Sequence, residues 1–334
     1  MNTFVLGFFL GFWFPSSVDV SPEVMPIKGI TVSCQGYGRV WGTDSFAKEL
    51  DRLVALGANS VTIHPYARIH DNGAVSWRSW EGGEPPAYLT RPILEAHARG
   101  LEIMIKPHLA YWGSRFSWRG EIAFEEPEER ERFFATYQQW IVAIAAATRD
   151  ADIFSVGTEL KLKTGDEQAW RDIIAAVRKV TQAKLTYAAN WDAYESVGFW
   201  EALDYIGIQG YFPLTTVADP SEEDLVQAWE TVLARVRRVH RAADRPVIFT
   251  EFGYNQSTLA ASKPWDYKEE HTQRAETLQA RCLQVGLEVI NREKRWLHGA
   301  FLWKWFAGPA PRANFRLNTP RLRAIISEAW LPSP

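Results

Sequence analysis

Residues 153–191 read IFSVGTELKLKTGDEQAWRDIIAAVRKVTQAKLTYAANW and contain the pattern that decides the fold. An apolar run at 153–159 is followed by a stretch with helical periodicity at 166–181 and by a second apolar run at 185–191. Both runs are short and bounded by turn residues, as is typical of strands. Two strands joined through a helix form the unit of a parallel sheet that is covered by helices.

The same alternation recurs along the chain, which contains eight such strand–helix pairs. The predicted strands cover residues 28–34, 60–64, 102–108, 153–159, 185–191, 205–211, 247–251 and 299–306. The predicted helices cover residues 44–56, 91–99, 127–148, 166–181, 222–241, 269–291 and 321–330, with a short helix near 195–201. Eight pairs predict an α/β fold of one domain, the (β/α)8 TIM barrel, whose usual size is roughly 250 residues plus insertions.

A doubly wound open sheet is the alternative fold. It calls for a glycine-rich phosphate loop after an early strand. The loop that follows the first predicted strand reads Gln35-Gly36-Tyr37-Gly38-Arg39 and lacks the third glycine of that fingerprint. The barrel is therefore favoured.

The composition is that of an ordinary globular protein. Of the 334 residues, 46% are hydrophobic and 23% are charged, and the net charge of -3 offers no basic surface for nucleic acid. The two cysteines, Cys34 and Cys282, are too few for a disulfide framework or a Cys-x-x-Cys metal site. We expect a monomer without a nucleic-acid partner.

The N-terminal segment differs from the rest of the chain. Residues 4–14 form an apolar run, and no charged side chain precedes Asp19, which is typical of an export segment. The run has no Lys or Arg before it, lacks a clear cleavage site and is shorter than the roughly 20 residues of a membrane-spanning helix. We expect residues 1–26 to be a signal or anchor segment with its lead-in, the protein's one contact with a membrane, and residues 27–334 to form the barrel. Secretion or attachment to the cell envelope follows, with a cytoplasmic protein as the alternative.

Polar and aromatic side chains gather where the predicted strands end, and in a barrel these carboxyl ends form the active-site face. Nine of the 16 tryptophans fall at strand ends or in the loops that follow: Trp41, Trp77, Trp80, Trp112, Trp118, Trp191, Trp265, Trp303 and Trp305. One loop tryptophan usually fills space beneath the loop. Nine on one face indicate a cleft for sugars, whose apolar ring faces stack on aromatic side chains while polar groups bind the hydroxyls.

Two glutamates stand out by position. Glu159 ends the fourth predicted strand and Glu251 ends the seventh. A carboxylate at the end of an apolar strand is costly to desolvate, so it has either a cationic partner or a chemical role. Two at the mouth of a barrel favour the carboxylate pair of a glycosidase, in which one acts as acid and base and the other as nucleophile.

Other enzyme classes lack their motifs in this sequence. There is no Gly-x-Ser-x-Gly elbow, Walker loop or His-Glu-x-x-His helix. His64 and His108 could ligate a metal in an amidohydrolase-like barrel, but that scheme usually has a His-x-His on the first strand, which here ends Val32-Ser33-Cys34. We therefore expect no metal and no cofactor.

From residue 29 to residue 306 the chain resembles glycoside hydrolase family 113, barrel enzymes of the large retaining clan with catalytic glutamates on strands four and seven. Six motifs in the family's order carry the resemblance: Ile105-Lys106-Pro107-His108, Gly157-Thr158-Glu159-Leu160, the run LTYAANWD at 185–192, the run YIGIQGYFPL at 205–214, Thr250-Glu251-Phe252-Gly253-Tyr254 and the run FLWKWF at 301–306. The resemblance implies endo-acting β-1,4-mannanase activity with Glu159 as acid/base and Glu251 as nucleophile.

The strand ends also supply the expected substrate-binding residues: His64, Lys106, His108, Trp112, Asn190, Trp191, Tyr211, Tyr254, Trp303 and Lys304. Among them, Tyr211 is placed to hydrogen-bond Glu251, and Trp303 to stack beneath the reacting sugar. Where the wider clan has an Asn before the acid/base that binds the sugar 2-hydroxyl, this chain has Thr158, so Asn190 is our candidate for that contact.

We therefore predict a retaining β-glycosidase that hydrolyses β-1,4-mannan or a related mannan-type glycan by a two-glutamate mechanism. A different β-glycan, such as glucomannan, cellulose or xylan, is the alternative within the class. A non-catalytic carbohydrate-binding barrel is the alternative outside it, and it would keep the tryptophans without needing both glutamates.

Overall fold

The computed structural model describes residues 25–80, 83–308, 310 and 314–332, and within them eight parallel strands close into a barrel. Around the barrel the strands follow the order β1-β11-β10-β9-β8-β7-β5-β2. Their bounds are β1 Ile27–Ser33, β2 Ser60–Ile63, β5 Glu102–Ile105, β7 Ile153–Thr158, β8 Lys184–Asn190, β9 Ile206–Gln209, β10 Val247–Phe252 and β11 Leu297–Phe306. The predicted TIM barrel is confirmed, and the open sheet is excluded.

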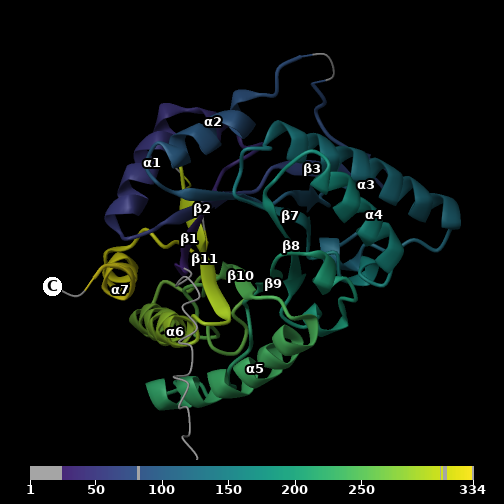
Figure 1. Cartoon of the computed structure of the whole chain (residues 1–334). Coiled ribbons are helices and arrows are strands. Elements are labelled where there is room, and N and C mark those ends of the chain that lie inside the picture. Colours follow the sequence, from purple (N-terminus) through teal and green to yellow (C-terminus); the bar gives the residue numbers. More distant parts are fainter. Residues whose placement is uncertain (1–24, 81–82, 309, 311–313, 333–334) are drawn as a thin grey trace, which may run out of the picture.

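Seven α-helices of the described chain surround the strands (Figure 1). They are α1 Asp44–Ala55, α2 Ala87–His97, α3 Pro127–Ala147, α4 Glu167–Arg178, α5 Glu222–Ala243, α6 Gln273–Arg292 and α7 Pro320–Trp330. Their starts follow from local chemistry, because Pro127 and Pro320 occupy first-turn positions where a missing N–H costs nothing. Ser221 and Asp224 cap α5 reciprocally through side chain and backbone.

Two apolar clusters fill the molecule on either side of the strands. The larger one lies between the barrel and its helices. The smaller one consists of Ile27, Met104, Ile153, Tyr205, Ile248 and Phe301. Direct chain neighbours of these six, such as Ile103 and Phe249, belong to the larger cluster, so strand alternation turns the six toward the barrel interior. The barrel is thus a packed core; small polar side chains such as Ser60, Ser155 and Thr186 are also buried within its strands, and the buried charged groups Lys106 and Glu251 lie at or near their carboxyl ends.

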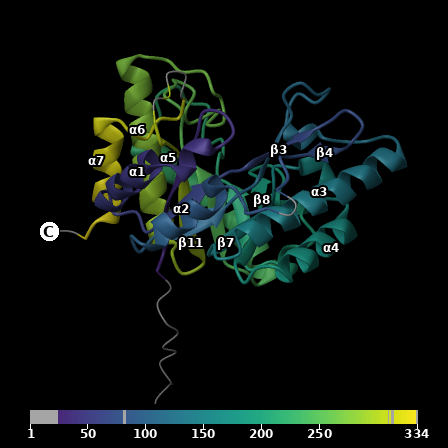
Figure 2. The same cartoon turned by 90° about the horizontal axis from the view of Figure 1, so that it is seen from above.

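The structure corrects several predicted bounds. The strand predicted at 102–108 is divided, since Pro107 has no N–H for a ladder, and β6 (His108–Ala110) pairs with β3 (Tyr66–Ile69) in a small separate sheet. β4 (Val75–Ser76) completes this sheet and lies beside α3, where Val75 N donates to Thr136 Oγ1 at 2.9 Å (Figure 2). The short helix predicted near 195–201 is two 3-10 turns, Tyr194–Ser196 and Trp200–Ala202, with Gly198 between them.

The predicted signal or anchor segment lies outside the described residues except for Met25 and Pro26, and it stays a prediction. In the described part of the chain, no helix combines the length and the apolar character needed to cross a membrane.

Candidate active site

Glu251 lies near the end of β10 with both carboxylate oxygens engaged. The Tyr211 hydroxyl donates to Oε2 at 2.7 Å, and the Lys106 ammonium donates to Oε1. The side chain of Glu251 is only 6% exposed. The expected contact with Tyr211 is therefore confirmed, and the two donors hold this carboxylate in one orientation. Burial raises the pKa of Tyr211 well above its usual value, and the charge of Glu251 raises it further, so the tyrosine stays a donor.

Lys106 follows β5 and is fully buried. We expected it to bind substrate, but its ammonium is turned toward Glu251 and also donates to the Thr250 carbonyl at 3.0 Å. Burial lowers the pKa of Lys106, and the charge of Glu251 opposes that effect. A buried ammonium is tolerable only when it is paired and hydrogen-bonded, so the pairing explains why a lysine can sit here.

Glu159 directly follows β7 and has a positive φ of 58°. Positive φ is uncommon for a residue with a side chain, and such strain clusters at functional sites. An Arg119 guanidinium nitrogen lies 3.0 Å from Oε2 of Glu159, whose side chain is 19% exposed. Burial raises the pKa of Glu159, Arg119 lowers it, and the charge of Glu251 raises it, with a raised pKa as the net result. Glu159 is therefore suited to carry a proton.

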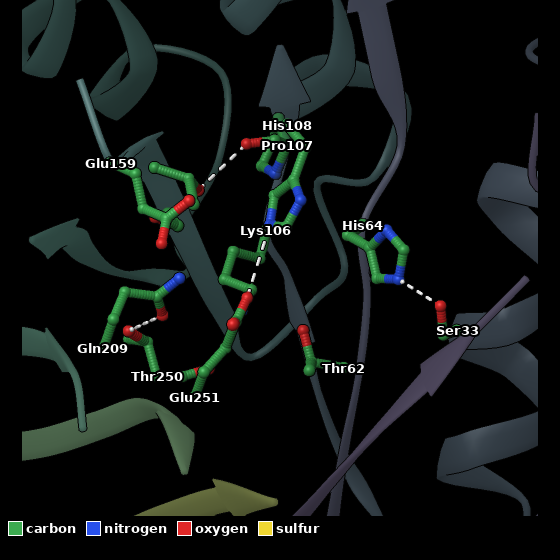
Figure 3. Close-up of polar contacts among 12 residues, drawn as sticks. Ser33, Thr62, His64, Lys106, Pro107, His108, Glu159, Gln209, Thr250 and Glu251 are labelled. Atoms are coloured by element: carbon green, nitrogen blue, oxygen red, sulfur yellow. Dashed lines mark hydrogen bonds and ion pairs between the residues drawn. The ribbon is translucent and has the colours of Figure 1, made fainter. Parts of the chain in front are cut away.

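Gln209 connects the two carboxylates from the end of β9. Its side-chain oxygen accepts a hydrogen bond from Thr250 Oγ1 at 3.0 Å, next to Glu251. Its amide nitrogen is directed toward Glu159, and both glutamates point into the space that this amide borders (Figure 3). The two carboxylates thus belong to different strands, β7 and β10, but lie in one polar centre at the carboxyl ends of the barrel strands.

His64 and His108 form a stacked pair beside this centre, with ring centroids 5.0 Å apart. Burial, followed by nearby cations, lowers the pKa of both rings well below the usual value, so both are neutral. The Arg119 guanidinium lies 3.3 Å from Nδ1 of His108, which must accept because guanidinium only donates. Nε2 of His108 therefore carries the proton, and it lies 3.7 Å from Glu251.

Trp303, in β11, covers the same side of the centre. Its ring lies nearly parallel to that of His108, with 6.2 Å between centroids, and the Lys106 ammonium is 5.2 Å from the indole centroid. Lys304 Nζ lies 5.0 Å from the centroid of the same ring, and burial lowers the pKa of Lys304 to about 8. An aromatic ring beside a carboxylate in a fixed orientation combines the apolar surface and the placed polar group that are typical of small-molecule sites.

The sequence model of glycoside hydrolase family 113 matches residues 30–318. The chain belongs to this family. Among solved structures, the GH113 β-mannanase AaManA from Alicyclobacillus acidocaldarius in complex with ManMIm is similar at TM-score 0.77 and 24% identity, over 92% of this chain and 98% of that chain. A complex of a GH113 β-1,4-mannanase is similar at TM-score 0.78 and 23% identity, over 92% and 99%. A Ruminococcus gnavus β-glucuronidase is similar at TM-score 0.62 and 13% identity, over 92% of this chain and 50% of that chain.

At such identities the solved structures show a shared fold. A comparison with curated protein sequences finds no match. Membership of family 113 makes the chain a glycoside hydrolase with a carbohydrate substrate, as predicted.

Three further predicted residues of this family 113 enzyme come at or just after the carboxyl ends of strands. Asn190 ends β8, next to the strand that leads to Glu159. Trp191 stacks on Trp265, with centroids 5.1 Å apart and planes at 16°. Trp112 is 56% exposed, and its ring lies 5.9 Å from that of Tyr66. All three therefore belong to the carboxyl-end face on which the two glutamates lie.

Tyr254, which was expected to bind substrate, lies away from the two carboxylates. It is buried, its ring packs 5.6 Å from that of Phe252, and its hydroxyl lies near Cys282 of α6. The pairing of β10 is irregular after Phe249, so that Glu251 reaches the polar centre while Phe252 packs in the helix-side cluster. Tyr254 continues on the side of Phe252.

Two of the nine tryptophans expected at the mouth belong to the core. The Trp41 indole donates to the Val32 carbonyl at 2.9 Å, and the Trp305 indole donates to Glu49 of α1 at 2.8 Å. Both side chains are buried. Trp305 diverges from Trp303 because the pairing of β1 and β11 is irregular between Leu302 and Trp305.

Sequence reasoning missed Arg119 and Gln209 as site residues. Arg119 lies in the 3-10 turn Arg119–Glu121, within a loop that has no periodicity to place it. Gln209 does carry a signal in the sequence, because it is a polar side chain at the end of an otherwise apolar strand, the same position that singled out Glu159 and Glu251.

Proposed function

We propose that this family 113 enzyme hydrolyses β-1,4-mannan or a related mannan-type glycan with retention of configuration. The observation that carries the proposal is that the two glutamates have different surroundings. Glu251 is held by Lys106 and Tyr211, while Glu159 has a raised pKa and a partly open side chain. The solved family 113 structures similar to this chain are β-mannanases, which supports mannan as the substrate.

In the first step, the ionised Glu251 attacks the anomeric carbon. The bond from that carbon to the glycosidic oxygen breaks, and Glu159 gives its proton to the departing oxygen. Tyr211 and Lys106 fix the carboxylate for this attack and need no reorganisation during it. The ring of Trp303 supplies a face for the reacting sugar.

In the second step, Glu159 removes a proton from water, whose oxygen attacks the anomeric carbon and releases Glu251. The ester between sugar and Glu251 carries no charge, so one of the influences that raise the pKa of Glu159 disappears when it forms. The same carboxyl group is thus an acid in the first step and a base in the second.

Recognition of the sugar 2-hydroxyl cannot come from the Thr158 hydroxyl in its present contact. That hydroxyl is buried and donates to the Pro107 carbonyl at 3.0 Å. Asn190 remains our candidate, because it is the last residue of β8, and β8 pairs with β7, the strand that leads to Glu159. Since the 2-hydroxyl is axial in mannose and equatorial in glucose, this contact bears directly on the choice of substrate.

The test is product analysis with oligosaccharides of β-1,4-mannan, glucomannan, xylan and cellulose. We expect cleavage only at mannosyl linkages, and cleavage of xylan or cellulose oligosaccharides at a comparable rate would contradict the proposal. The Glu159→Gln protein provides the control for a binding-only barrel, because it should bind the mannan oligosaccharide without turnover. Equal turnover by the wild type and the variant would remove Glu159 from the chemistry.

A further inference from the structure

A cavity of about 690 Å³ opens beside the catalytic centre, between the loop after β1 and the small β3-β4-β6 sheet. Its volume falls within the roughly 300–1,000 Å³ of small-molecule sites. Tyr66 joins the cavity to the centre, because it lines the cavity while its ring lies 5.3 Å from that of His64 and 5.7 Å from that of His108. A glycan bound at the two glutamates can therefore extend into this cavity.

The lining combines aromatic faces with three guanidinium groups. Trp77, Trp80 and Trp112 line it together with Arg39, Arg68 and Arg78. Arg39, Arg78 and Tyr88 line both this cavity and an adjoining pocket, which places the two positive charges on the same side of the cavity. Arg68 donates to the Trp112 carbonyl at 3.3 Å and so stays within the lining.

These positive charges are not neutralised by the described part of the chain. No Asp or Glu among the described residues lines the cavity, and none forms an ion pair with Arg39, Arg68 or Arg78. Glu84 lies in an adjoining pocket of about 440 Å³ with Arg39 and Arg78 but pairs with neither. Arginines elsewhere in the described chain do form ion pairs, for example Arg91 with Asp44 and Arg99 with Asp51.

A neutral mannose unit would stack on the aromatic faces and could accept hydrogen bonds through its hydroxyls, but it would leave the positive charges of the three guanidinium groups uncompensated. Guanidinium groups bind carboxylate and sulfate oxygens through charge-assisted hydrogen bonds in a fork geometry. We propose that this cavity is a subsite for a sugar unit that bears a negatively charged group. The enzyme then prefers acidic mannan-type glycans over neutral ones, a specificity that rests on the proposed function for its backbone sugar.

The experiment compares β-1,4-mannotetraose with two charged forms of it. In one form a terminal mannose is oxidised to mannuronate, at either end in turn, and in the other a terminal mannose carries a 6-sulfate. For the wild type we expect kcat/KM on a charged form to exceed that on the neutral form by about tenfold, the effect of one charge-assisted hydrogen bond. The preference should shrink at high salt because the arginines are solvent-exposed. Whichever form is preferred identifies the charged group.

The variant Arg39→Gln/Arg78→Gln should bring the ratio of charged to neutral kcat/KM close to one. Arg149→Gln is the matched control, because Arg149 is exposed and lies outside this cavity, and it should keep the wild-type ratio. Equal kcat/KM on all three oligosaccharides, or a ratio unchanged in the double variant, would overturn the inference.

The experiment distinguishes failure of the proposed mannan hydrolysis from failure of the proposed charged-sugar subsite. If the wild type cleaves none of the oligosaccharides, mannan hydrolysis is contradicted. Calorimetry on the Glu159→Gln protein then still measures the affinity of the cavity for each form. Tighter binding of a charged form, lost with the two arginines, supports the subsite, and equal affinities contradict it.

Discussion

Lys106 and Glu251 form an ion pair whose side chains are 0% and 6% exposed. Removing two charges from water costs several kcal/mol for each ion, and close geometry with further hydrogen bonds is needed to offset that cost. The Thr250 carbonyl and the Tyr211 hydroxyl supply those hydrogen bonds. A pair of this kind is weak evidence for stability but strong evidence for a carboxylate that has to stay ionised in one orientation.

Lys106→Met is expected to destabilise the protein by roughly 3–5 kcal/mol, because it leaves a buried carboxylate without its cation. The double variant Lys106→Met/Glu251→Gln removes both charges and should regain most of that stability while remaining inactive. Urea unfolding measures the stabilities, and Lys48→Met, at an exposed lysine of α1, is the control. A single variant as stable as the wild type would mean that the two groups are not paired in solution.

Glu251→Ala removes the nucleophile and should lower turnover by several orders of magnitude. Azide can occupy the space and attack the anomeric carbon in its place, so added azide should restore turnover on an aryl β-mannoside and yield an α-mannosyl azide. Circular dichroism checks that the variant is folded. Retention of more than about a tenth of the activity, a barrier change under about 1.4 kcal/mol, would contradict the role of Glu251.

The loop between β6 and α3 positions the Arg119 guanidinium next to Glu159, the proposed acid/base. Its 3-10 turn carries Arg119, which also donates to the Leu109 carbonyl at 3.2 Å and contacts His108. The loop is held to its surroundings where Arg115 N donates to Asp71 at 2.6 Å. Arg119 lowers the pKa of Glu159 against the effects of burial and of Glu251, so this loop adjusts the pH range in which the acid works.

Arg119→Gln should move the alkaline limb of the kcat/KM profile to higher pH. The sign follows from the chemistry: Arg119 stabilises the ionised form of Glu159, so its loss raises the pKa further, and the carboxyl keeps its proton to higher pH. Arg115→Gln, in the same loop but paired with Glu129, is the matched control and should leave that limb in place. A limb that moves to lower pH, or does not move, would show that Arg119 does not set this ionisation.

Elements with strong periodicity could be predicted from the sequence, and those that depend on tertiary contacts could not. The apolar runs predicted the barrel strands, but the strand predicted at 102–108 ran through Pro107. The pairing of β6 with β3 beyond that proline depends on the spatial arrangement. Position at strand ends predicted Glu159, Glu251 and Tyr211. It did not predict Arg119, which reaches the site through a loop without periodicity, or the turn of Tyr254 away from it.

At the scale of the whole molecule, the apolar residues that stabilise the barrel and the polar residues of the candidate active site occupy different parts of it. The apolar cluster of Ile27, Met104, Ile153, Tyr205, Ile248 and Phe301 fills the interior, while the polar centre lies at the carboxyl ends of the strands. Substrate therefore meets two glutamates that approach from different strands of one rigid scaffold. We predict carboxyl groups roughly 5–5.5 Å apart, as in retaining glycosidases, rather than the roughly 6.5–9.5 Å of inverting ones.

The anomer that is released first from a β-1,4-mannan oligosaccharide tests this account most directly, because one experiment reports both the linkage cleaved and the route. Proton NMR recorded before mutarotation should show the β-anomer appearing first, since two displacements at the anomeric carbon restore its configuration. Initial appearance of the α-anomer would mean a single displacement by water and would contradict the roles assigned to both Glu159 and Glu251.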